Sequence, residues 1–283
     1  MAVIIDGREV SKNKRIEIAA NVAKLKAEKG ITAGLAVVIV GADPASQIYV
    51  RNKKKACEEV GINSFEYALS EETSQEELLA LIDKLNTSDE VHGILVQHPM
   101  PSHIDEDIIF RSISPDKDVD AFHPFNVGLI MMNDYKLLPC TPAGVMELLK
   151  AYDIPVEGKD VVVIGRSNIV GKPQAMLMLH ANATVTICHS RTKNLADITR
   201  CADIVVAAIG KAEFVKGDMI KDGCVLIDVG MNRGADNKLK GDIDFASCES
   251  KASYITPVPG GVGPMTITML MNNTYIAAEE LAK

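Results

Sequence analysis

The sequence predicts a two-domain α/β protein with parallel sheets. Its 283 residues are about twice the length of a typical domain of roughly 150 residues. Apolar, β-branched runs alternate with helical patterns, and most of these runs lack the polar–apolar alternation of half-exposed strands. An irregular stretch at 114–133 interrupts the series, which restarts after a boundary near 138–141. We therefore expect two α/β domains with a cleft between them.

Each element follows from its local pattern. Short apolar runs predict strands at 35–40, 64–68, 93–96, 160–164, 184–188, 204–208 and 225–228. Helical patterns lie between them at 11–29, 44–60, 74–85, 142–152, 173–181 and 195–201. This alternation indicates parallel strands. Parallel sheets of this kind bind ligands at the carboxyl ends of their strands.

Composition excludes several classes of partner. The net charge of −8 argues against a nucleic-acid scaffold and against attachment to anionic lipid. The uncharged stretch at 252–278 contains prolines and glycines, so we expect no membrane span there. The six cysteines form no CxxC pair, which predicts free thiols in a reducing cytoplasm.

The second domain carries a candidate dinucleotide-binding turn. The stretch GRSNIVGKP at 165–173 follows a buried strand and opens a helix, which directs free backbone amides at a phosphate. Ser167 replaces the second glycine of the usual pattern, so a purely structural turn stays open as an alternative. The next strand runs into Ser190 and Arg191, where an enzyme that uses NAD usually has an acidic residue. With Arg166, they suit a 2′-phosphate and predict NADP; the simpler alternative is that Arg191 is a solvated surface charge.

The first domain has a lysine on an apolar helix face. At 100° per residue, one sector of the helix at 44–60 contains Ser46, Tyr49, Val50, Lys53, Ala56, Cys57 and Val60. A lysine there must snorkel to water, pair with another group or line a cleft. Burial lowers the pKa of an ammonium group, which would make Lys53 a usable acid or base near neutral pH. A snorkelling lysine without a catalytic part remains the alternative.

Other polar residues of the first domain lie beside strand ends. Gln97 ends the strand at 93–96, where parallel sheets bind ligands. The DKDVD run at 116–120 resembles the start of a calcium loop but lacks its glycine and glutamate, so we expect no metal. Two interpretations stay open: a turn of solvated carboxylates, or one carboxylate, such as Asp120, aimed at a ligand.

A loop rich in glycine and proline precedes the last helical segment. Residues 257–264 hold three glycines and three prolines. This density exceeds what a turn needs and predicts close approach of the backbone to a ligand, although a simple turn is the alternative.

Six short motifs follow one another along nearly the whole chain. They are YVRNK at 49–53, VQHPMP at 96–101, KDVD at 117–120, PCTP at 139–142, GRSNIVGKP at 165–173 and PGGVGPMT at 259–266. Together they resemble the motifs of the bifunctional methylenetetrahydrofolate dehydrogenase/cyclohydrolase family. Two places depart from the family pattern: Ala121 stands where Gly is usual, and His98 and Met100 stand where Leu is common.

The resemblance implies an enzyme that oxidises methylenetetrahydrofolate with NADP and hydrolyses the methenyl product to formyltetrahydrofolate. It implies that Lys53 handles protons, that Gln97 holds Lys53, and that Tyr49 and Asp120 contact the pterin region. The loop residues expected to close over the folate are Pro259, Gly260 and Gly261. The residues expected at NADP are Gly165, Arg166, Ser167, Ser190, Arg191 and Met231.

The resemblance also implies an organisation and a cellular role. Residues 1–139 would form a folate-binding catalytic domain to which the helix at 265–283 returns, and residues 140–264 a Rossmann-like NADP-binding domain. A homodimer in the cytoplasm, one-carbon metabolism and purine biosynthesis are implied as well. A shikimate-type dehydrogenase would explain only the second domain. A non-catalytic NADP sensor would need no lysine on an apolar face.

Overall fold

The chain forms two compact α/β units, each with its own parallel sheet. The computed structural model describes residues 1–41, 44–234 and 238–283, with the backbone alone of 44–49. The six-stranded unit comprises Met1–Lys12 and Thr141–Thr266, and the three-stranded unit comprises Asn13–Cys140 and Ile267–Lys283. The predicted fold class, two α/β domains with parallel sheets, is confirmed.

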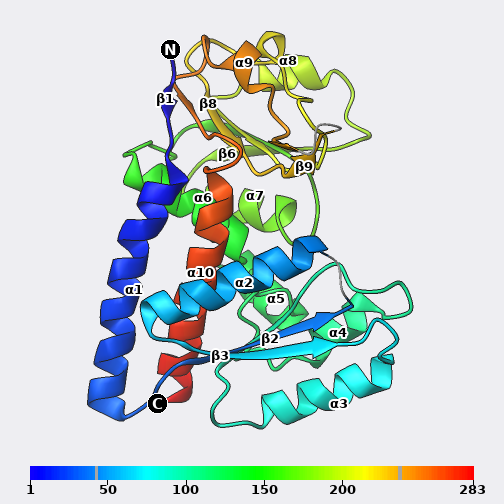
Figure 1. Cartoon of the computed structure of the whole chain (residues 1–283). Helices are drawn as coiled ribbons and strands as arrows, with labels where there is room; N and C mark the ends of the chain where they lie inside the picture. Colours follow the sequence, from blue (N-terminus) through cyan, green and yellow to red (C-terminus); the bar gives the residue numbers. More distant parts are fainter. Residues whose placement is uncertain (42–43, 235–237) are drawn as a thin grey trace. The chain divides into compact units, whose positions relative to one another are not determined.

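The three-stranded unit is built around a central strand that is buried along its whole length. Its strand order is β3 (Asn63–Leu69), β2 (Gly34–Val40), β4 (Gly93–Val96). Alternate residues of β2 join one apolar cluster with α3 (Gln75–Asn86) and α4 (Glu106–Ser112). Figure 1 shows α2 (Pro44–Val60) on the opposite face of this sheet from α3. At the edge, every residue of β3 is partly or fully exposed.

Local capping explains where two helices of this unit begin. Ser74 and Glu77 form a capping box at the start of α3, as the pattern at 74–85 predicts. The stretch at 114–133, predicted to be irregular, instead contains α5 (Pro124–Met132), so that prediction is wrong. The Nδ1 atom of His123 accepts the N–H of Phe125 at 3.0 Å, and Pro124 occupies the first turn.

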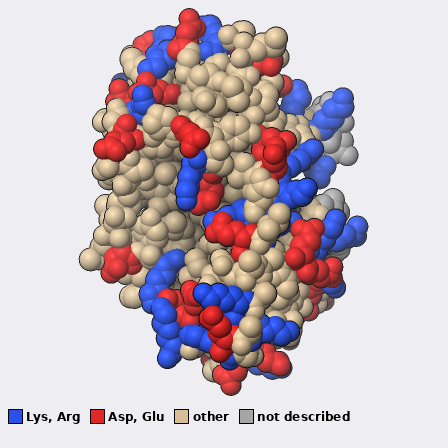
Figure 2. Space-filling model, turned by 90° about the vertical axis from the view of Figure 1, so that its left-hand side faces the viewer, with Lys and Arg blue, Asp and Glu red and all other residues tan. Residues whose placement is uncertain are grey.

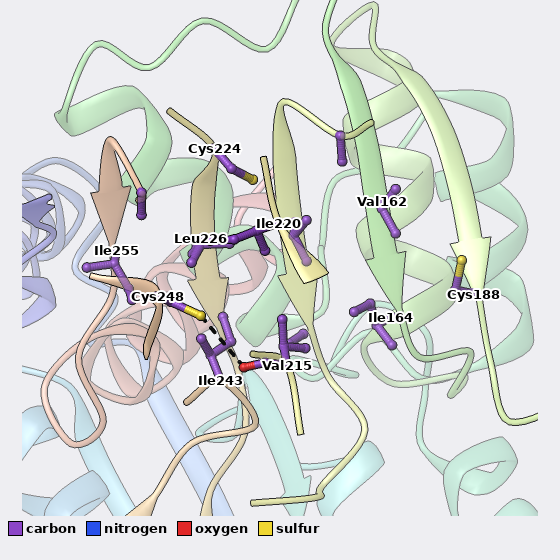
Figure 3. Close-up of a cluster of buried hydrophobic side chains, with 14 residues drawn as sticks. Val162, Ile164, Cys188, Val215, Ile220, Cys224, Leu226, Ile243, Cys248 and Ile255 are labelled. Atoms are coloured by element: carbon purple, nitrogen blue, oxygen red, sulfur yellow. Dashed lines mark hydrogen bonds between the residues drawn. The ribbon is translucent and has the colours of Figure 1, made fainter. Parts of the chain in front are cut away.

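The six-stranded unit has the strand order β1, β11, β8, β7, β5, β6. Its apolar cluster on one face includes Val162, Leu226 and Ile255 from three different strands (Figure 3). β1 pairs in parallel with β11, so the first residues of the chain complete a sheet formed by its second half. The strand bounds are β1 Val3–Ile4, β5 Asp160–Ile164, β6 Thr184–Cys188, β7 Ile204–Ala207, β8 Val225–Asp228 and β11 Tyr254–Ile255.

The chain passes between the two units within helices. α1 (Gly7–Lys29) and α10 (Val262–Leu281) each begin in the six-stranded unit and continue in the three-stranded unit, and α6 (Cys140–Ala151) begins at the third crossing. The remaining elements belong to the six-stranded unit. They are α7 (Gly171–His180), α8 (Leu195–Thr199), η1 (Gly217–Met219), β9 (Asn232–Arg233), β10 (Leu239–Lys240) and α9 (Phe245–Cys248).

Charged side chains of both signs are intermixed on the face that Figure 2 shows. Lys14 pairs with Glu17, and Arg15 pairs with Glu59 at 2.6 Å.

None of the described helices combines the length and the hydropathy that a bilayer-spanning segment requires. The six cysteines are free, and all but Cys201 are buried.

Candidate functional site

A buried lysine bonded to an amide forms the centre of the candidate site in the three-stranded unit. Lys53 lies on α2 with only 9% of its surface exposed, on the face that also buries Ala56, Cys57 and Val60. Its Nζ atom donates to Oε1 of Gln97 at 2.8 Å. Of the possibilities considered for a lysine on this face, the structure thus shows pairing with another group, the Gln97 amide. The side chains of Ser46 and Tyr49, predicted on the same face, lie outside the described residues.

Gln97 is fixed by the end of β4. Its backbone N–H donates to the carbonyl of Val38 at 2.7 Å, which continues the ladder between β4 and β2. Its Nε2 atom donates to the carbonyl of His98 at 2.7 Å. Since the amide nitrogen is used there, the Oε1 atom is the one turned to Lys53.

Burial governs the protonation of Lys53. It lowers the pKa of the ammonium group because water that would stabilise the charge is removed. The negative charge of Asp120 opposes this shift. Lys53 is thus a group that can exchange a proton more readily than a surface lysine.

Asp120 lies beyond a segment that runs beside β4. A parallel bridge joins Ile94 to Asp118, so Gln97 and Asp120 follow paired positions and emerge at the same edge of the sheet. Burial raises the pKa of Asp120 to about 6, while Lys53 opposes the rise. Ala121 next to it has φ 56°, a left-handed conformation that explains why glycine suits this position.

Two other groups of the acidic turn, Lys117 and Asp118, are structural, whereas Asp116 is exposed. The carboxylate of Asp118 is buried, so it is not solvated, and accepts hydrogen bonds from N–H of His123 and from Nδ2 of Asn126 at 2.8 and 2.9 Å. The Nζ atom of Lys117 donates to the carbonyl of Ser88 at 2.7 Å, just beyond the carboxyl end of α3. Among the described residues, no group of three His, Cys, Asp or Glu side chains could hold a metal ion.

Two of the residues that depart from the family pattern, His98 and Met100, contact the first residue of α4. The Nδ1 atom of His98 lies 2.9 Å from Oε1 of Glu106, and the backbone N–H of Met100 donates to the same oxygen at 3.1 Å. Both residues thus position the segment that follows Gln97.

The six-stranded unit contains the candidate cofactor turn between β5 and α7. Gly165 has φ 134°, and a Cβ atom there would lie 2.3 Å from the carbonyl oxygen of Ala208. A Cβ atom at Gly171 would lie 2.4 Å from the carbonyl oxygen of Gly165. Ser167 is exposed, and its Oγ atom accepts the N–H groups of Val170 and Gly171, both at 3.2 Å. These two amides at the start of α7 therefore already have a partner.

The next strand brings the two predicted 2′-phosphate residues to the same edge. Ile164 of β5 pairs with Cys188 of β6, so Arg166 and Ser190 each follow the paired position by two residues. Arg166, Ser190 and Arg191 are exposed. The backbone N–H of Arg191 donates to Nδ1 of His189 at 3.1 Å, which closes the turn after β6.

The predicted loop residues Pro259, Gly260 and Gly261 belong to the six-stranded unit. A Cβ atom at Gly7 would lie 1.8 Å from the carbonyl oxygen of Gly261, so this loop approaches the start of α1 closely. Gly260 has φ 113° and is buried. The glycines predict that the loop backbone lies close to another group. Within this unit, that group is the first turn of α1.

Two buried carboxylates that sequence reasoning missed organise the loops after β7 and β8. Asp228 accepts backbone N–H groups of Gly230, Asp242 and Ile243, and burial raises its pKa to about 6. Asp242 accepts three backbone N–H groups at 209–211 and Nδ2 of Asn232. Met231, which is 45% exposed, lies on the loop that they hold. An aspartate that ends an apolar run, with a glycine two residues later, is the signal that could have identified Asp228.

Comparisons with known proteins cover both units. The family model "Tetrahydrofolate dehydrogenase/cyclohydrolase, catalytic domain" matches residues 5–120. The model "Tetrahydrofolate dehydrogenase/cyclohydrolase, NAD(P)-binding domain" matches residues 139–282. The resemblance carried by the six motifs is confirmed.

Individual relatives agree over the full length. The bifunctional protein FolD of Magnetococcus marinus is 60% identical and aligns over 99% of this chain and 98% of its own. The crystal structure of the bifunctional enzyme FolD from Campylobacter jejuni has a TM-score of 0.95 at 52% identity, covering 99% of this chain and 100% of that one.

Two further structures mark the range of similarity. A FolD structure from Trypanosoma brucei, complexed with NADP cofactor and inhibitor, has a TM-score of 0.95 at 41% identity, covering 100% and 99% of the two chains. Shikimate dehydrogenase from Aquifex aeolicus has a TM-score of 0.52 at 14% identity over 88% of this chain and 97% of its own, which shows a shared fold alone. The chain therefore belongs to the tetrahydrofolate dehydrogenase/cyclohydrolase family.

Proposed function

We propose that this chain oxidises methylenetetrahydrofolate to methenyltetrahydrofolate with NADP and hydrolyses the product to formyltetrahydrofolate. The observation that carries the proposal is the buried Lys53, bonded to Gln97 and electrostatically coupled to Asp120, in a member of this family. A shikimate-type dehydrogenase shares the fold alone. A sensor that binds NADP without turnover would have no use for an amine with a lowered pKa.

The six-stranded unit fits NADP. Gly165 and Gly171 keep the turn between β5 and α7 tight, because a Cβ atom at either one would clash with the backbone. Exposed Arg166 and Arg191 supply positive charge at the edge where a ribose phosphate would lie. After β6, the first acidic residue is Asp197, which pairs with Arg200. NADP, when bound, supplies the hydride acceptor, and the residues around it bind and orient.

The roles proposed for the residues are those that the family resemblance implies. Lys53 gives and takes the proton that water attack on the methenyl carbon requires, and Gln97 holds its Nζ atom. Asp120 accepts a hydrogen bond from the pterin ring, and Tyr49 borders the pterin. Pro259, Gly260 and Gly261 cover the folate. Gly165, Arg166, Ser167, Ser190, Arg191 and Met231 contact NADP.

The cellular setting belongs to the same proposal. Five buried free thiols support a reducing, cytoplasmic location. The formyl product is a one-carbon donor of the kind that purine biosynthesis consumes, so a strain that lacks the enzyme is expected to need purines. The folate substrate is the small-molecule partner.

Substitution of Lys53 by Met tests the centre of the site. We expect hydrolysis of methenyl-folate to fall by about a hundredfold to ten-thousandfold, because the proton-handling group is removed. Oxidation of methylene-folate should fall less, since hydride transfer needs positioning rather than a proton. Stability should hold or rise, because a buried charge is replaced by an apolar chain of similar volume. Separate assays of the two reactions and urea unfolding measure these effects.

Lys55→Met is the matched control, since Lys55 is an exposed lysine of the same helix. It should leave both reactions unchanged. Wild-type hydrolysis by a folded Lys53→Met variant would show that Lys53 is only a structural lysine.

Substitution of Asp120 by Asn tests folate recognition. We expect weaker folate binding and unchanged NADP binding, because Asp120 belongs to the three-stranded unit. The pKa of about 6 gives a second signature. Below pH 6 the wild-type carboxyl is protonated and loses its accepting charge, so folate affinity should fall as pH drops through 6, and the variant should lack this fall.

Calorimetric titration of each ligand between pH 5 and 8 gives both results. Asp116→Asn, which changes an exposed carboxylate of the same turn, should bind folate normally. Equal losses for folate and NADP would point to a collapsed turn instead.

Cofactor preference tests the charged edge of the six-stranded unit. A charge-assisted hydrogen bond contributes about 1.5–3 kcal/mol, so we expect a preference for NADP over NAD of roughly tenfold to a hundredfold. Arg191→Ser should lower this ratio, measured as kcat/KM for each cofactor. Lys193→Ser, at another exposed basic residue of the same turn, should leave it unchanged. A wild-type enzyme equally efficient with both cofactors would overturn the assignment.

A homodimer is the proposed assembly, and an unpaired edge supports it. Among the described strands, β6 pairs only with β5, and its Ile187 is 38% exposed. Ile187→Lys should convert a dimer to a monomer in sedimentation experiments. Ile16→Lys, at an exposed position of α1, should not. A wild-type chain that sediments as a monomer at micromolar concentration would contradict the proposal.

A further inference from the structure

A buried asparagine of the last helix ties together two segments of the three-stranded unit. Asn273 lies on α10 with 2% of its surface exposed. Its Nδ2 atom donates to the carbonyl of Val119 at 2.8 Å and to the carbonyl of Leu138 at 2.7 Å. An amide group has two N–H hydrogens, so these bonds use both.

The two carbonyls lie next to residues of the candidate site. Val119 immediately precedes Asp120, and Leu138 lies two residues before Cys140. The Sγ atom of Cys140 lies 3.4 Å from the carbonyl oxygen of Val119 and 3.7 Å from Oδ1 of Asp120. Asn273 thus fixes the backbone on both sides of a thiol–carboxylate contact.

Cys140 is a donor in this contact. Its side chain is buried, and burial raises the pKa of the thiol well above its usual value, so the thiol stays neutral and keeps its hydrogen. The Nδ2 atom of Asn273 lies 3.7 Å from the same sulfur. The thiol is therefore held in place and can direct its hydrogen to the Asp120 carboxylate or to the adjacent carbonyl.

Asp120 in turn acts on Lys53. The charges of these two groups oppose the effect of burial on each other, so the place of the carboxylate affects the protonation of the amine. The groups that act on Asp120 come from several segments. They are Lys53 of α2, Asp118 of its own turn, Cys140 at the start of α6 and His98 after β4.

We propose that Asn273 and Cys140 are positioning residues of this enzyme, which fix the Asp120 carboxylate relative to Lys53. Neither needs to touch the substrate. Asn273 acts through the backbone of Val119 and Leu138, and Cys140 acts through its thiol hydrogen. This inference rests on the roles proposed above for Lys53 and Asp120.

The cysteine pair of variants, Cys140→Ala and Cys140→Ser, gives the sharpest test. Alanine removes the donor, whereas serine restores one of similar size. We expect the acid midpoint of the pH profile of methenyl-folate hydrolysis to rise by about half to one pH unit in Cys140→Ala, because the ionised carboxylate loses a donor. In Cys140→Ser the midpoint should return toward the wild-type value.

The asparagine is tested by Asn273→Leu, which keeps the size and removes both donors. Here kcat for hydrolysis should fall about tenfold and the acid midpoint should move, while KM for NADP stays unchanged. Asn272→Leu is the control, because it makes the same change at the neighbouring, half-buried position of α10. Thermal unfolding establishes that each variant is folded. If Asn273→Leu does not fold, the pH profiles of Cys140→Ala and Cys140→Ser alone test the proposal.

Reference variants separate this inference from the proposed function. If Lys53→Met and Asp120→Asn hydrolyse methenyl-folate at the wild-type rate, the roles of these two residues are wrong, and the inference falls with them. If both are impaired while the Cys140 and Asn273 variants keep the wild-type pH profile and kcat, only the positioning role is overturned. A rise of the midpoint in Cys140→Ala that Cys140→Ser reverses supports it.

Discussion

Lys53 is almost completely buried, and several contacts within the three-stranded unit stabilise its ammonium group. Removing a charged group from water costs several kcal/mol unless hydrogen bonds and opposite charges offset the loss. Here one bond from Nζ to Gln97 and the field of Asp120 oppose that cost. The result is an amine whose pKa lies below that of a lysine on the surface.

The support of Lys53 extends through the sheet. Gln97 keeps its orientation because its Nε2 atom is occupied by the carbonyl of His98, and its backbone continues the pairing of β4 with β2. Asp120 keeps its place because the segment before it runs beside β4, with Asp118 anchored to His123 and Asn126. Register in the sheet therefore sets the geometry of charges at its edge.

Local pattern was sufficient for most of the elements and for part of the site. Strands such as β4 and β5 have the predicted bounds because apolar β-branched runs between turns admit few alternatives. Lys53 was identified because helical period alone places it among Ala56, Cys57 and Val60. Gln97 followed from its position after a buried strand.

Contacts between distant residues could not be predicted in this way. Asn273 meets Val119 across 154 residues, and nothing near either one in the sequence signals the contact. α5 was missed because its mostly apolar segment has no clear periodicity, while its cap at His123 is formed by an imidazole rather than by the usual hydroxyl or carboxylate. Only coordinates reveal that the Ser167 hydroxyl turns back to accept the amides of Val170 and Gly171.

The pairing of β1 with β11 has a consequence for how the protein is made. Val3 and Ile4 leave the ribosome some 250 residues before their sheet partners, Tyr254 and Ile255. At a synthesis rate of about 5–20 residues per second, these first residues wait roughly 10–50 seconds for their neighbours. The three-stranded unit waits as well, because residues 267–283 complete it. The six-stranded unit can therefore reach its final form only after residue 266 has been translated, and the three-stranded unit only after residue 283. The nascent chain carries an unfinished core throughout that interval.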